Sequence, residues 1–162
     1  MPISDQHSVD EQHMQHALSE ARKAFEQQEV PVGAVVIHDG KIIGRGRNSR
    51  EGLNDPTAHA ELLALTAAAN TLGDWRLSSS VLYVTKEPCA MCAGALVNAR
   101  VVRVVFGAWD EQAGCCGSLY QLCRDPRFNH QVEVQGGVLE AQCQQLLKEF
   151  FARSRAARKR GP

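Results

Sequence analysis

The stretch SSSVLYVTKEPCAMCAGALVNARVVRVVFGA, residues 78–108, decides the fold of this chain. It opens with SSSVLYVT, residues 78–85, and closes with VVRVVFGA, residues 101–108, and the apolar, β-branched centres of both runs predict buried strands. Pro88 stands between them, where the first turn of a helix over 89–100 does not need its missing N–H. The stretch therefore predicts a strand, a helix and a second strand in succession.

Three patterned segments precede this unit. Apolar residues recur at helical spacing over residues 9–28, which predicts a first helix. Two β-rich runs flank Asp39-Gly40, a pair typical of a type I′ hairpin turn. A helical pattern over 58–70 then follows Asp55-Pro56-Thr57, and we expect Asp55 or Thr57 to cap that helix.

The remaining segments complete a single domain, expected to span residues 1–162. Residues 109–131 predict a loop with a short helical turn, 131–137 a short strand, and about 138–160 a basic C-terminal helix. Near-continuous apolar strands separated by helices imply a sheet covered on both faces. The expected fold class is α/β, a three-layer α/β/α sandwich with a mixed central sheet of about five strands.

Composition limits the classes to which the protein can belong. The chain has 162 residues, 44% of them apolar, which suits one compact core. It shows neither an apolar run of membrane-spanning length nor a secretory leader, so we expect no membrane association and a cytoplasmic location. In a reducing compartment, its six cysteines favour metal binding or catalysis over disulfides.

The charge is unevenly distributed, although 18 basic and 18 acidic residues give a net charge of zero. Residues 151–162 carry five basic side chains and no acidic one, so the rest of the chain has a net charge of −5. Such a tail favours contact with an anionic partner such as nucleic acid. A solvated, frayed helix end explains the same charges without a partner.

Cys89 and Cys92 lie three residues apart at the start of a predicted helix. Residues at this spacing share one helix face, so both sulfurs can bind one atom. The positive end of the helix dipole favours thiolates, the form that zinc binds. A redox pair or two small core residues are the alternative interpretations of this motif alone.

A second motif, His59-Ala60-Glu61, opens the preceding helix. One imidazole and two thiolates give zinc three protein ligands and leave its fourth position to water, as in catalytic sites. Bound zinc lowers the pKa of that water to about 7, and Glu61 is placed to transfer protons. H-x-E followed by P-C-x-x-C is a known signature of zinc nucleobase deaminases, which replace an exocyclic amine by a carbonyl and release ammonia.

Longer segments carry a more specific resemblance. VPVGAVV, TAHAE, LYVTKEPCAMCAGALVNARVVRVVFGA, AGCCGSL and FNH make residues 9–151 resemble the bacterial tRNA-specific adenosine deaminases. The resemblance implies the cytidine-deaminase-like fold and conversion of the wobble adenosine of a tRNA anticodon loop to inosine. It also implies one Zn²⁺ per subunit, no organic cofactor and a homodimer. At matching positions, it implies His59, Cys89 and Cys92 as zinc ligands and Glu61 as the proton shuttle.

The same resemblance assigns contacts with the substrate. It implies that Asn48 hydrogen-bonds the flipped nucleoside, that Val32 forms a wall of the base pocket, and that Asp110 lies in an RNA-contact loop. Because the last helix is basic, Arg153 and Arg155 are expected to contact phosphates of the anticodon stem.

Two residues depart from the family pattern. Lys86 stands before EPC where an apolar residue is expected, and Trp109 stands after FGA where a polar residue is frequent. Trp109 suits stacking on a loop base or packing within the protein. Neither change affects the expected zinc ligands, so the departures bear on substrate preference.

Two other functions fit the zinc motifs. One is a deaminase of a free base or nucleoside, of the guanine or cytosine type, which the basic tail and the long loop over 109–131 disfavour. The other is a non-catalytic, zinc-stabilised RNA-binding module. That module requires a fourth protein ligand from Cys115, Cys116 or Cys123, and it leaves Glu61 without a role.

Overall fold

The computed structural model describes residues 2–161 and contains five helices, five strands and one 3₁₀ turn within that range. In chain order they are α1 (Ile3–Glu26), β1 (Gly33–His38), β2 (Lys41–Arg47), α2 (Arg50–Leu53), α3 (Ala60–Leu72), β3 (Ser80–Lys86), α4 (Ala90–Asn98), β4 (Arg103–Ala108), η1 (Leu122–Arg124), β5 (Glu133–Gln135) and α5 (Glu140–Lys159).

The strands form one mixed sheet in the order β2-β1-β3-β4-β5. β1 pairs antiparallel with both β2 and β3, whereas β3, β4 and β5 run parallel. Asp39 and Gly40 both have positive φ, at 50° and 74°, as a type I′ turn requires. The predicted hairpin, the strand–helix–strand unit and the five-stranded mixed sheet are confirmed.

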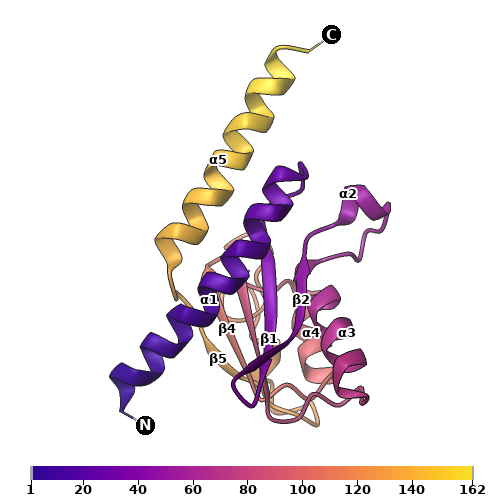
Figure 1. The fold of residues 1–162 in the computed structure, drawn as a ribbon, viewed down its shortest axis with the longest axis vertical. Helices are drawn as coiled ribbons and strands as arrows, with labels where there is room; N and C mark the ends of the chain where they lie inside the picture. Colours follow the sequence, from indigo (N-terminus) through magenta and orange to yellow (C-terminus); the bar gives the residue numbers. More distant parts are fainter. Residues whose placement is uncertain (1, 162) are drawn as a thin grey trace.

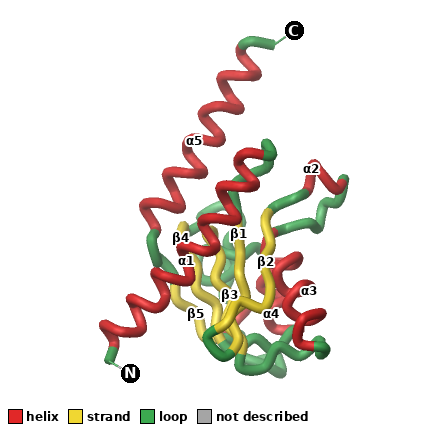
Figure 2. The backbone as a smooth tube through the Cα atoms, in the orientation of Figure 1, coloured by secondary structure: helices red, strands yellow, loops and turns green. Residues whose placement is uncertain are grey.

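Helices cover both faces of the sheet, and the three-layer prediction is confirmed. Figures 1 and 2 show α1 and α5 on one face and α3 and α4 on the other. Phe106, Leu82 and Leu96 belong to the core beneath α3 and α4, while Met14 and Leu18 belong to the core beneath α1. The second half of α5 extends past the sheet (Figure 1), which places the basic end of the chain away from both cores.

The capping prediction was wrong. Oδ1 of Asp55 accepts hydrogen bonds from the backbone N–H and the hydroxyl of Thr57, at 2.8 and 2.7 Å, and so closes a turn before the helix. The N-cap of α3 is His59, whose side chain makes no capping hydrogen bond. The imidazole is therefore available for other contacts.

Gly46 allows α3 to lie directly against β2. A Cβ at this position would lie 2.2 Å from the carbonyl oxygen of Ala60 and 2.6 Å from the backbone nitrogen of Ala64. We expect Gly46→Ala to force α3 away from the sheet and lower the free energy of unfolding by about 1–3 kcal/mol.

Urea unfolding measures this effect, with Gly94→Ala as the matched control. Gly94 lies within α4, and a Cβ there meets no atom within 4 Å. The control should be neutral or stabilise the protein by up to about 1 kcal/mol. Equal stability of the two variants would contradict the close approach of α3 to β2.

Candidate active site

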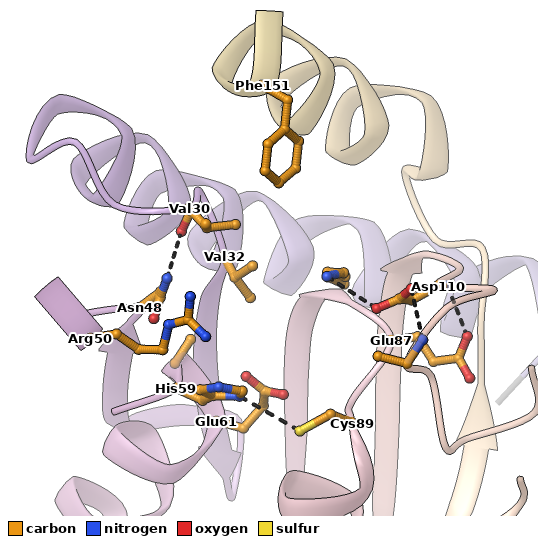
Figure 3. A pocket seen from close by; sticks show the side chains of 13 residues that line it. Val30, Val32, Asn48, Arg50, His59, Glu61, Glu87, Cys89, Asp110 and Phe151 are labelled. Atoms are coloured by element: carbon orange, nitrogen blue, oxygen red, sulfur yellow. Dashed lines mark hydrogen bonds and ion pairs between the residues drawn. The ribbon is translucent and has the colours of Figure 1, made fainter. Parts of the chain in front are cut away.

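Two helix N-termini bring the predicted metal ligands together. His59 and Cys89 are the N-cap residues of α3 and α4, and Cys92 lies in the first turn of α4. Nδ1 of His59 lies 3.6 Å from the Sγ atom of each cysteine. Figure 3 shows His59 and Cys89 at the base of a cavity, beside Glu61.

This cluster has the dimensions of a zinc site. The three donor atoms lie within 4.8 Å of one another. Tetrahedral zinc, with Zn–N and Zn–S bonds of about 2.0 and 2.3 Å, separates its nitrogen and sulfur ligands by about 3.5 Å. The observed separations fit that geometry. Within residues 2–161, no further His, Cys, Asp or Glu joins the cluster, so the described protein supplies three ligands.

The pKa values of the two thiols are shifted in opposite directions. A hydrogen bond with Cys92, followed by one with His59, lowers the pKa of Cys89 to about 3. The hydrogen bond to Cys89, together with burial, raises the pKa of Cys92. Because zinc binds cysteine as thiolate, metal binding at this pair would release a proton from any thiol that is still protonated.

Glu61 is a buried carboxyl beside this cluster. It lies in the first turn of α3, only 4% exposed, and it lines the cavity. Burial raises its pKa, against the effect of hydrogen bonds that favour the carboxylate. A carboxyl whose pKa is raised in this way is better suited to accept a proton and return it than a fully exposed one.

The cavity, of about 340 Å³, has the size of a small-molecule site. Val32, Asn48 and Asp110, three of the residues predicted to bind substrate, line it, and their contacts with a substrate stay predictions. Nδ2 of Asn48 donates a hydrogen bond to the carbonyl oxygen of Val30 at 3.4 Å (Figure 3). Oδ1 of Asn48 is buried and receives no hydrogen bond from the described residues, so its acceptor capacity is unused within the protein.

The two arginines predicted to bind RNA lie outside this cavity. Arg153 and Arg155 are exposed on α5, and the Arg153 guanidinium lies 4.9 Å from the ring centroid of Phe25. From the same helix, Phe151 points toward the cavity mouth (Figure 3). Their contacts with RNA stay predictions.

Sequence reasoning missed several residues around the cavity mouth. Arg50 lines both this cavity and a neighbouring one, which also includes Arg158 and Phe151. The basic tail was the signal for Arg158. Nothing in the sequence pointed to Arg50, because the short α2 helix carries no periodic pattern.

Glu87 is another residue that the sequence did not single out. This buried carboxylate accepts hydrogen bonds from the backbone N–H groups of Asp110 (3.0 Å), Cys116 (3.1 Å) and Ser118 (2.9 Å), and from the Ser118 hydroxyl. Gly114 lies so close to it that a Cβ there would be 2.3 Å from the carboxyl carbon. Glu87 therefore fastens the loop after β4 to the side of the cavity.

We expect Glu87→Gln to loosen this loop. The amide presents an NH₂ group to donors, which leaves buried N–H groups unpaired and lowers the free energy of unfolding by about 2–4 kcal/mol. Thermal unfolding and limited proteolysis over residues 109–118 measure the change. Glu111→Gln, on an exposed residue of the same loop, is the control and should leave both unchanged. If Glu87→Gln became more sensitive to protease elsewhere in the chain while this loop stayed protected, the role of Glu87 in holding the loop would be contradicted.

The other cysteines are buried thiols apart from the ligand cluster. The Sγ atoms of Cys116 and Cys123 lie 3.7 Å from each other, and the Cys115 thiol donates to the carbonyl oxygen of Ala113. The four-ligand arrangement that a non-catalytic zinc module requires is thus not found among residues 2–161.

The fold and the two motifs define a nucleobase-type deaminase, and residues 8–155 match the family model of the MafB19-like deaminases. A tRNA-specific adenosine deaminase of Bacillus subtilis is 51% identical over 150 residues, which cover 93% of each chain. The chain belongs to the family of tRNA-specific adenosine deaminases.

Solved structures agree with this family. One, from a study of A-to-I editing by tRNA:A34 deaminases at the wobble position of transfer RNA, has a TM-score of 0.81 and 42% identity, covering 84% of this chain and 99% of its own. A guanine deaminase from Nitrosomonas europaea has a TM-score of 0.74 at 27% identity, covering 88% of this chain and 84% of its own. The architecture is thus shared by enzymes with macromolecular and free-base substrates.

None of the helices within residues 2–161 has both the length and the hydropathy needed to cross a bilayer.

Proposed function

We propose that this protein hydrolytically deaminates the wobble adenosine of a tRNA anticodon loop to inosine and releases ammonia. The observation that carries the proposal is the placement of Glu61 beside a three-ligand His-Cys-Cys cluster at the base of an open cavity. The 51% identity to a tRNA-specific adenosine deaminase supports the choice of substrate.

Asn48 and Val32 hold the base above the cluster. The adenine must leave its stack to enter a cavity of this depth, and an unpaired loop makes that step inexpensive. Val32 packs against the apolar ring, and the free Oδ1 of Asn48 accepts a hydrogen bond from an N–H or O–H group of the nucleoside.

His59, Cys89 and Cys92 hold one Zn²⁺ per subunit, and no organic cofactor is required. When bound, zinc supplies a water molecule activated for attack on the ring carbon that carries the amine. Glu61 accepts a proton from the attacking water and delivers it to the adjacent ring nitrogen. It then carries the second proton to the departing amine, so the products are a ring carbonyl and ammonia.

The mouth of the cavity provides the contact with RNA. Asp110 accepts a hydrogen bond from a sugar hydroxyl or a base, and Arg153 and Arg155 reach phosphates of the anticodon stem. The overhanging half of α5 (Figure 1) presents these cations beyond the body of the protein. Their contribution is independent of sequence and weakens with salt.

The chain acts as one domain over residues 1–162, in the cytoplasm, and as a homodimer. Leu62, Leu63 and Met91 are only half-buried on α3 and α4, and a second copy offers these apolar side chains a partner. Light scattering at micromolar concentration tests the assembly, and a mass equal to one chain would contradict it.

An inosine assay tests the proposed reaction. Purified protein loaded with zinc is incubated with a tRNA that carries adenosine at the wobble position, and sequencing reads inosine as guanosine. The control substrate carries guanosine at that position. Ammonia release from free guanine without inosine formation would assign the protein to the other activity seen among its structural neighbours.

A further inference from the structure

Lys86 places a cation on the wall of the substrate cavity. It is the last residue of β3 and lines the cavity together with Asp110. Its Nζ atom lies 3.1 Å from Oδ2 of Asp110, and the two side chains are 32% and 12% exposed. Figure 3 shows Asp110 facing Asn48 and Arg50 across the cavity, above the level of Glu61. The ion pair thus lies near the mouth, away from the metal ligands.

The acid of this pair is held rigidly. Oδ1 of Asp110 accepts hydrogen bonds from the backbone N–H groups of Gln112 and Ala113, at 3.0 and 3.2 Å. The Asp110 N–H donates to the buried Glu87 carboxylate at 3.0 Å. Because its partner cannot move freely, the Lys86 ammonium is positioned at low cost in side-chain entropy.

The ammonium retains capacity to bind a ligand. A lysine has three N–H donors, and the contact with Asp110 occupies one of them. Nζ has no other ion-pair partner among residues 2–161. A neutral free base carries no negative charge and offers a cation at the cavity mouth only uncharged hydrogen-bond acceptors. A nucleotide within RNA brings a phosphate on either side of its sugar, just where the base enters.

We propose that Lys86 binds a backbone phosphate beside the flipped adenosine and so favours RNA over free nucleobases. Asp110 positions the ammonium for this contact through Oδ2, while its Oδ1 accepts hydrogen bonds from the backbone of its own loop. Arg50 provides a second cation on the opposite wall (Figure 3), so the walls can hold the chain on both sides of the extruded base. This inference rests on the proposed function and adds a substrate-positioning residue to it.

Lys86→Met tests the phosphate contact, because it removes the charge and retains the length of the side chain. Kinetics are measured with an anticodon stem-loop at several KCl concentrations. We expect KM to rise about 5- to 10-fold and kcat to stay within about twofold. The slope of log(kcat/KM) against log[KCl] should become shallower by about 0.7, as for one lost contact with a single-stranded phosphate.

Three further variants separate this role from a structural one. Lys86→Arg should keep the wild-type salt slope. Lys41→Met, at the exposed hairpin, should leave KM and the slope unchanged. In an Asp110→Asn background, Lys86→Met should still reduce the slope. An unchanged slope in Lys86→Met, or an effect that disappears in the Asp110→Asn background, would overturn the proposal and leave Lys86 as a support for Asp110.

Failure of the Lys86 phosphate contact can be told apart from failure of the proposed reaction. If the wild-type protein forms no inosine from the stem-loop, the proposed reaction is wrong. The same salt series, measured on the dissociation constant of the stem-loop, then decides whether Lys86 contacts phosphate.

Discussion

Glu61→Gln is expected to reduce inosine formation by about 10²–10⁴-fold, the range that a general acid–base group contributes. The amide has nearly the same volume, but it cannot accept the proton of the attacking water or return it to the base. Glu61 is buried at the base of the cavity, and the burial that raises its pKa also keeps bulk water from replacing it. The reaction therefore has no alternative proton carrier in this position.

The measurement pairs single-turnover inosine formation with the metal content of the purified protein. Glu61→Gln should retain stoichiometric zinc and the wild-type melting temperature, because the three metal ligands are unchanged. Glu26→Gln, on an exposed residue near the end of α1, is the matched control and should keep full activity. Wild-type turnover in Glu61→Gln would remove the proton-shuttle role and the mechanism that depends on it.

The architecture could be predicted because apolar residues follow different patterns along strands and along helices. The centres of β3 and β4 are continuously apolar over 81–84 and 104–106, a pattern typical of strands covered on both faces. The Asp39-Gly40 pair predicted the hairpin because a type I′ turn requires positive φ at both residues, as the structure shows. The ligand cluster followed from two short motifs, since each lies at the start of its own helix and both helices pack on the same face of the sheet.

Features that depend on contacts distant in sequence could not be predicted. One local prediction also failed, since a turn with Thr57 competes for the Asp55 carboxylate that was expected to cap the helix. Glu87 gains its role from amides that lie 23–31 residues further along the chain. Phe151 reaches the cavity only because α5 passes over the end of the sheet (Figure 3). Nothing in the sequence distinguishes Glu87 and Phe151 from other residues of their types, because their contacts form only in the folded chain.

Cys92→Ala is expected to abolish both metal binding and activity. The loss of one of three protein ligands should weaken zinc affinity by more than about a hundredfold, since changing residues that merely support ligands already costs about 10–100-fold. The variant also removes the hydrogen bond that lowers the pKa of Cys89. The remaining imidazole and thiol then offer the cation two protein ligands in place of three.

Cys143→Ala separates this effect from the loss of a buried thiol. Cys143 is as buried as Cys92 but lies in α5, against Gly107, and takes no part in the ligand cluster. Both substitutions leave a small void and lower stability, but only Cys92→Ala should lose zinc in a competition with a chromogenic chelator. Retention of stoichiometric zinc and turnover by Cys92→Ala would show that the ion lies elsewhere. The close approach of His59 to two sulfurs would then be a packing contact, without a part in the chemistry.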